Sequence, residues 1–146
     1  MNRRHWSNRL AVALAIALAA CGRLPATGTT SLYDRLGGAG VMVPVVSETV
    51  DTIVADPEVN QSFQQVRLGR VKKHIHAFIC ELADGPCTYA GDPIKIVHAG
   101  LGIREKEFNA LVQALRDALH RHGVPESAKN ELLRRLAPLK PDIVTA

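Results

Sequence analysis

Apolar residues at helical spacing, interrupted only by glycine, proline and short polar segments, restrict the fold of this chain more than any other feature. The clearest pattern runs from Leu68 to Leu82, where Val71, Ile75 and Phe78 fall on one stripe of a helix. Helical patterns also cover residues 32–36, 41–55, 93–101, 105–122 and 127–136. No strand pair or hairpin is indicated. The sequence therefore predicts an all-α domain.

Residues with special backbone preferences mark the ends of these helices. Ser31 suits the cap of the first helix, and Pro93 suits the first turn of a later one. Gly123 closes the long helix 105–122, as glycine commonly does at a helix C-terminus. In the tail, we expect Pro138 and Pro141 to break the helical structure.

The first twenty residues resemble a bacterial lipoprotein signal peptide. Arginines at positions 3, 4 and 9 precede an apolar run of eleven residues, Leu10 to Ala20, which is too short for a permanent membrane helix. The resemblance implies cleavage before Cys21 and lipidation of that cysteine. The alternative is an ordinary signal peptide cut near Ala20. We therefore expect a signal peptide over 1–20, a lipidated Cys21 with a flexible tether over 21–30, and a folded domain over 31–146.

This interpretation implies an exported protein that is held on a bacterial membrane and faces the periplasm. Gly22 replaces the Asp that retains such proteins at the inner membrane, which favours the outer membrane. Without the first twenty residues, which hold three of the 18 basic residues and no acidic residue, the charge is almost balanced by the 14 acidic residues. The charge therefore gives no support to nucleic-acid binding.

Two cysteines remain after Cys21 is lipidated. Cys80 and Cys87 could form a disulfide in an oxidising compartment. Alternatively, Cys80 is a small buried apolar residue and Cys87 a loop thiol. The sequence leaves both alternatives open, because it does not give the Cα separation that a disulfide requires.

No nucleophile motif, phosphate-binding glycine loop or paired-carboxylate pattern occurs, so the histidines are the informative residues. His120 and His122 lie beside Arg121 at the predicted end of a helix, where we expect solvated positive charges. His76 lies about 200° around its helix from His74, so we expect it to face water.

His74 and His98 each lie on the apolar stripe of a predicted helix, far enough apart in sequence for one helix to turn back past the other. Two imidazoles in one apolar space could bind a metal centre from opposite sides. Structural zinc is poorly supported, because no further ligands stand at suitable spacing, whereas haem needs only one or two axial ligands and apolar walls. The alternative is a hydrogen-bonded core histidine. The walls would be Phe63, Ile75, Phe78, Val97, Leu101, Ile103 and Phe108.

Six short motifs follow one another between residue 31 and about residue 140. They are SLYDRLGG (31–38), IVADP (53–57), Phe63, Gly85-Pro86 with Tyr89 and Gly91, HAGLGI (98–103) and Phe108. In their order and spacing they resemble the group 1 truncated haemoglobins. The resemblance implies a shortened globin fold, a two-over-two helical sandwich around haem b. It also implies that His98 is the proximal iron ligand and that Phe63 packs on the haem edge.

On the distal side the sequence departs from the pattern of the family. Thr49 and Val50 replace the Phe-Tyr pair that many members carry, and Ile75 replaces a Gln. Val71 supplies no donor either, so bound dioxygen should escape faster. His74 matches a distal histidine that ligates iron in some cyanobacterial members. The resemblance thus implies that His74 is a sixth iron ligand or a residue that gates the ligand.

Together these features predict a haem b protein that reversibly binds oxygen or nitric oxide, with an electron-transfer or gas-sensing role and an unidentified reductase as hypotheses. The missing distal tyrosine argues against nitric oxide dioxygenation. The alternatives are a haem-free, lipid-anchored helical module and redox sensing through Cys80 and Cys87. Lys95 is either a partner for a haem propionate or a solvated charge. The expected haem contacts are His98, His74, Phe63, Val50, Val71, Ile75, Phe78, Val97, Leu101, Ile103 and Phe108.

Overall fold

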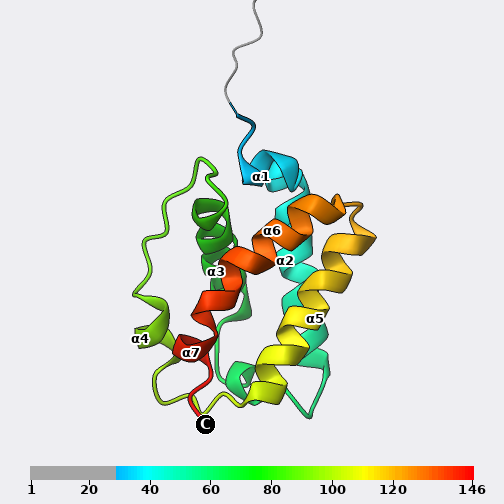
Figure 1. The fold of residues 1–146 in the computed structure, drawn as a ribbon. Coiled ribbons are helices and arrows are strands. Elements are labelled where there is room, and N and C mark those ends of the chain that lie inside the picture. Colours follow the sequence, from blue (N-terminus) through cyan, green and yellow to red (C-terminus); the bar gives the residue numbers. More distant parts are fainter. Residues whose placement is uncertain (1–28) are drawn as a thin grey trace, which may run out of the picture.

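The computed structural model describes residues 29–146, and every regular element in that range is helical (Figure 1). The predicted signal peptide and most of the tether lie outside the described residues. Two short 3-10 helices, η1 (Gln61–Phe63) and η2 (Ala137–Leu139), accompany the α-helices. The α-helices are α1 (Leu32–Arg35), α2 (Gly38–Ala55), α3 (Leu68–Leu82), α4 (Ile94–His98), α5 (Glu105–Arg121), α6 (Glu126–Leu136) and α7 (Lys140–Ile143).

The long helices form two layers (Figure 1). α2 packs along α5 and also contacts α3, while α6 crosses in front of α2 and reaches α1. The short helices α4 and α7 lie side by side beyond the end of α3 that points away from α1, close to the C-terminus. Residues of α3 and α4 line a common cavity, to which α2 and α5 also contribute.

The start of α2 depends on one glycine. Gly37 has φ +96°, a left-handed conformation that side chains disfavour, and a Cβ there would lie 2.4 Å from the side chain of Val41. This tight turn lets α2 begin at Gly38 rather than at the predicted Val41. The predicted cap of α1 is confirmed, because the Asp34 backbone N–H donates to Ser31 Oγ at 3.0 Å.

The main core lies where α1, α2, α5 and α6 meet. Leu36, Met42, Val45, Leu119 and Leu132 are among its almost fully buried side chains. Burial of each large apolar side chain contributes about 1.5–3 kcal/mol. α2 is apolar enough to cross a membrane by length and composition alone, a test that core helices also pass. Its buried residues identify it here as the central helix of the core.

α3 has the clearest amphipathic pattern, yet it buries only Ile79 and Cys80. The stripe residues Val71, Ile75 and Phe78 are half-buried. They are incompletely covered because the stripe faces the space between α3 and α4 and only its C-terminal end joins the core.

Two predictions about histidines are wrong. His76 does not face water: its ring is half-buried, and its Nε2 lies 2.8 Å from the Tyr33 hydroxyl. α1 carries Tyr33 over that side of α3, a contact between distant segments that helical spacing does not reveal. His122 is half-buried and lies 2.9 Å from Glu48 on α2, so it is not a freely solvated end charge.

The structure settles the pairing of the two cysteines, which the sequence left open, and corrects the prediction that the tail is not helical. Cys80 and Cys87 form a disulfide, with their Cα atoms 5.7 Å apart. The tail remains helical through η2 and α7, because Pro138 and Pro141 occupy the first turns of these helices, where a backbone N–H has no helical partner. The tail then returns to the domain, where the Thr145 N–H donates to the Ile103 carbonyl at 2.9 Å.

Candidate functional site

A cavity of about 620 Å³ lies between α3 and α4 and extends toward α2 and α5. Its volume is in the range of sites that hold a ligand of substantial size. Apolar residues predominate in its lining. All of the predicted haem contacts line it, namely His98, His74, Phe63, Val50, Val71, Ile75, Phe78, Val97, Leu101, Ile103 and Phe108. Their contact with haem itself stays a prediction.

Several large apolar side chains of this lining are unusually accessible. Val66, Val97 and Leu101 are 42%, 40% and 48% exposed, and all three border the cavity. Exposed apolar surface of this kind is unfavourable in water and is covered when an apolar ligand binds. The cavity therefore suits a large ligand with apolar faces.

His98 is fixed by a hydrogen bond within its own helix. Its Nδ1 lies 2.7 Å from the Ile94 carbonyl oxygen, which can only accept, so Nδ1 carries the proton and donates. The second ring nitrogen, Nε2, is then unprotonated in the neutral ring and has a lone pair for a metal. Because His98 lines the cavity from α4 and is half-buried, it has the properties of an axial iron ligand.

The lining contributed by α2 and by the N-terminal half of α3 offers few hydrogen-bond donors. Val50 is fully buried, and Val71 and Ile75 complete an apolar surface. The Thr49 hydroxyl donates to the Val45 carbonyl within α2 at 2.8 Å, so its proton is already used. A polar ligand in this part of the cavity would find no donor from these four side chains.

His74 lines the same cavity from α3, so the structure brings the two predicted histidines to one site. His74 is exposed, however, and its ring lies against Tyr89, with ring centroids 6.2 Å apart. It therefore lies at the mouth of the cavity and not on a closed apolar face.

Few charged side chains line the cavity, and Lys95, the candidate partner of a propionate, is not among them. Arg70 and Asp92 are exposed and border the cavity, whereas Lys95 is exposed and does not belong to the lining. Glu107 is buried at the start of α5 and accepts hydrogen bonds from the Arg104 backbone N–H and side chain. Arg70 is thus the cation of the lining that can meet a carboxylate of a ligand.

Sequence reasoning missed several lining residues. Tyr89, which the sequence offers only as part of a motif, lines the cavity, and Gly91 two residues later leaves room for its ring. The tail, which the two prolines predict to be broken, contributes Leu136, Leu139 and Ile143 to the lining. Their spacing of three and four residues is the helical signal that the two prolines obscured.

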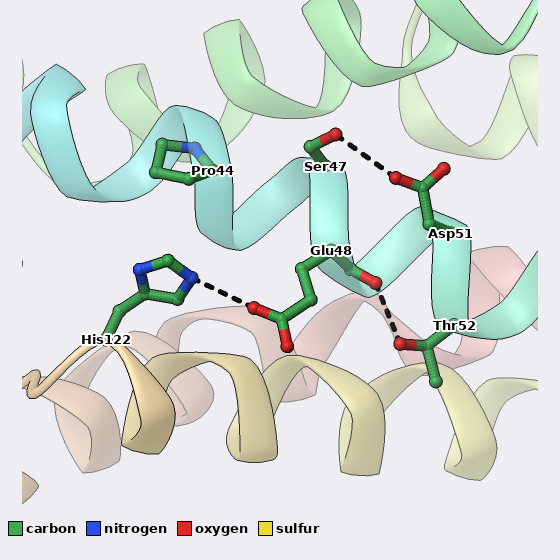
Figure 2. A pocket seen from close by; sticks show the side chains of 6 residues that line it. All are labelled: Pro44, Ser47, Glu48, Asp51, Thr52 and His122. Carbon is green, nitrogen blue, oxygen red and sulfur yellow. Dashed lines mark hydrogen bonds and ion pairs between the residues drawn. The ribbon is translucent and has the colours of Figure 1, made fainter.

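A second depression, of about 650 Å³, lies on α2 and at the end of α5 (Figure 2). Figure 2 shows His122 directed at the carboxylate of Glu48, and Arg121 Nε donates to the same group at 2.5 Å. The hydrogen bonds from Arg121 and then His122 hold the pKa of Glu48 below its ordinary value. Arg121 and His122 both pair with the Glu48 carboxylate, so the depression marks an ion-pair contact between α2 and the end of α5.

Comparison with known proteins is consistent with this architecture. A family model described as bacterial-like globin matches residues 31–145. A group 1 truncated haemoglobin of Mycolicibacterium paratuberculosis is 36% identical over 115 residues, which cover 79% of this chain and 85% of that protein. One from Nostoc sp. (strain MUN 8820) is 29% identical, with 76% and 94% covered. 

The fold agrees with a solved relative. The Fe(III) form of truncated haemoglobin from Tetrahymena pyriformis has a TM-score of 0.75 at 24% identity, covering 80% of this chain and all of that one. The predicted all-α, two-over-two arrangement is thereby confirmed.

Proposed function

The chain belongs to the bacterial-like globin family, and we propose from this premise that it binds haem b and reversibly binds a diatomic gas. The observation that carries the proposal is the placement of His98, whose Nδ1 is engaged by Ile94 while the ring lines an apolar cavity. The relatives are truncated haemoglobins over most of their length, which supports the same cofactor here.

Different residues would bind the iron, the macrocycle and a propionate of haem b. His98 would supply the iron ligand on one face, and Phe63, Phe78 and Phe108 would cover the apolar macrocycle and exclude water. Arg70 would pair with a propionate at the mouth, in place of Lys95. When bound, the iron supplies an open coordination position at which a gas such as oxygen or nitric oxide binds.

We propose that His74 competes with the gas for the sixth coordination position. Val50, Val71 and Ile75 donate no hydrogen bond, so they would not retain a polar gas ligand. His74 is the side chain of the α3 lining whose ring nitrogens can either bind iron or donate a hydrogen bond to a bound gas. Weak retention of oxygen disfavours nitric oxide dioxygenation and favours sensing or single-electron transfer, with a reductase still to be identified.

Substitution of His98 tests the proposal. Purified full-length wild-type protein with added haem should show a strong Soret band, and His98→Ala should lose most of it because the axial ligand is gone. His120→Ala is the matched control, since His120 is an exposed histidine outside the cavity lining. A wild-type chain that takes up no haem would favour the haem-free module. An unchanged His98→Ala spectrum would rule out this residue as the ligand.

Substitution of His74 tests the sixth ligand separately. The ferrous protein without added gas should show sharp, split visible bands where His74 is bound, and His74→Leu should convert them to a five-coordinate spectrum. His120→Leu should leave the bands unchanged. If His74→Leu also leaves them unchanged, His74 is not a ligand, while binding of haem through His98 is unaffected by that result.

We also propose that the protein is exported and anchored through lipid on Cys21. The disulfide between Cys80 and Cys87 supports an oxidising compartment such as the periplasm. The wild type, expressed in a bacterium, should fractionate with membranes and incorporate labelled fatty acid. Cys21→Ala should lose the label, whereas Cys87→Ala should retain it. Absence of label from the wild type would contradict the anchor.

A further inference from the structure

Tyr89 is the aromatic residue that connects the segment before α4 to the cavity-facing side of α3. Its ring centroid lies 5.3 Å from that of Phe78, and the ring planes are inclined by 79°. It lies 6.2 Å from the centroid of His74, at 84°. Both are edge-to-face arrangements at favourable separations. Tyr89 therefore contacts both the His74 ring and Phe78 in the wall of the cavity.

The position of Tyr89 is itself fixed by its neighbours. Its hydroxyl donates to the Asp92 carbonyl at 3.0 Å, and a Cβ at Gly91 would lie only 2.4 Å from the tyrosine ring. Cys87, two residues earlier, is bonded to the fully buried Cys80 on α3. The disulfide thus ties the segment that carries Tyr89 to the helix that carries His74.

The contact between Tyr89 and His74 lies at the mouth of the cavity. His74 is exposed and Tyr89 is half-buried, whereas the deep lining residues Val50 and Ile79 are buried. His98 is half-buried on α4. Because His74 is exposed at the mouth of the cavity, we expect its ring to lose the contact with Tyr89 if it turns inward toward iron held by His98.

We propose that Tyr89, anchored by the Cys80–Cys87 disulfide, is a positioning residue that retains His74 at the mouth of the cavity. In this position His74 leaves the sixth coordination position open to gas. The inference rests on the proposed function, because it assumes iron held by His98. It adds Tyr89 as a residue that sets the ratio of six-coordinate iron, with His74 bound, to five-coordinate iron. It also adds the disulfide as the covalent bond that keeps Tyr89 in place.

The first test measures the contact without haem. In the full-length protein without added haem, Tyr89→Leu should shift the NMR signals of the His74 ring protons, because the ring current of Tyr89 is lost. Tyr89→Phe is the matched control, since it keeps the ring, and should leave these signals near their wild-type positions. His74→Leu identifies the signals. Unchanged His74 signals in folded Tyr89→Leu would overturn the contact.

The second test measures coordination in the haem-loaded, gas-free ferrous protein. Tyr89→Leu should raise the ratio of six- to five-coordinate iron by about two- to tenfold, as expected from loss of one edge-to-face contact. Tyr89→Phe should stay close to wild type. Replacement of both cysteines by alanine should raise the ratio in the same direction as Tyr89→Leu. A constant or lower ratio in folded Tyr89→Leu would overturn the proposal.

A His74→Leu background separates positioning from general structural damage. There Tyr89→Leu should have no effect on coordination, because the ligand it releases is missing. An equal effect in both backgrounds would overturn the proposal. Failure of the wild type to bind haem would instead contradict the proposed function, and the NMR result would remain interpretable.

Discussion

At the scale of single residues, a side chain's chemistry depends on which of its atoms are already engaged. His98 has two ring nitrogens, and the bond from Nδ1 to the Ile94 carbonyl leaves Nε2 with a lone pair that is free to bind a metal. His76, two residues after His74, is occupied by the Tyr33 hydroxyl and does not reach the cavity lining. All three histidines lie on helices, as the sequence predicts. The partner of His98 is local, four residues earlier in α4, whereas the contacts of His74 and His76 come from tertiary packing.

Gly85 gives a residue-scale prediction for the disulfide region. A Cβ there would lie 2.7 Å from Cys80 Sγ, 2.7 Å from the Tyr33 ring and 2.8 Å from the Cys80 carbonyl oxygen. Gly85→Ala should therefore destabilise the protein by about 1–3 kcal/mol, as overpacking does. The free energy of unfolding in urea provides the measurement. Gly40→Ala is the control: a Cβ there meets nothing within 4 Å, and alanine suits a helix interior, so we expect unchanged or slightly higher stability.

At the scale of helices, amphipathic patterns predicted the long helices well and the proline-containing tail poorly. The bounds of α3, Leu68–Leu82, agree with the sequence prediction. Val71, Ile75 and Phe78 of its stripe line the cavity, as the sequence predicts, while Ile79 and Cys80 near its C-terminus belong to the core. α7 was missed, because proline normally signals the end of a helix and the first-turn exception depends on where the helix starts.

The tail helices give a prediction about retention of the cofactor. Ile143 on α7 is half-buried and lines the cavity. Ile143→Ala should speed the loss of haem to a scavenging globin by about fivefold, because roughly 1 kcal/mol of apolar contact is removed. Val43→Ala, at an exposed position of α2 outside the lining, is the control and should leave the rate unchanged. Equal rates in wild type and Ile143→Ala would show that the tail does not contact haem.

The contact of α2 with the end of α5 predicts a dependence on pH. Hydrogen bonds from Arg121 and then His122 lower the pKa of Glu48 from its ordinary 4.5, so the carboxylate is more stable in the folded than in the unfolded protein. This contribution is present above pH 4.5 and is lost as the pH falls through the lowered pKa. Glu48→Gln should reduce stability at pH 7, and the difference from wild type should shrink in acid.

Urea denaturation at several pH values measures this effect. Glu58→Gln is the control, because Glu58 is exposed and forms none of the ion pairs found among residues 29–146. A difference between wild type and Glu48→Gln that is constant with pH would contradict the assignment to the carboxylate.

At the scale of the whole molecule, the fold combines a tightly packed core with a cavity whose apolar lining is partly exposed. The core joins α1, α2, α5 and α6, whereas α3 and α4 border the cavity. The disulfide connects these two parts, since Cys80 belongs to the core cluster and Cys87 begins the segment that leads to Tyr89. The disulfide therefore joins the core directly to the segment that carries Tyr89.

The disulfide gives a whole-molecule prediction. It closes a short loop with a sequence separation of 7, for which chain entropy gives a stabilisation of about 2–3 kcal/mol. Addition of a dithiol reductant should lower the free energy of unfolding by about this amount. A variant with alanine at both cysteines should be less stable than the oxidised wild type and should not respond to the reductant. An unchanged wild type in reductant, with free thiols verified by mass spectrometry, would contradict the prediction.

The sequence by itself determined the helical class, most helix bounds and the positions of His98 and His74, because these depend on local spacing and on motifs. Only the tertiary structure decided the pairing of Cys80 with Cys87, the hydrogen bond of His76 and the place of Tyr89 against His74. The physical reason is that such contacts join segments whose distance and orientation follow from the packing of whole helices. No periodicity within one segment contains that information.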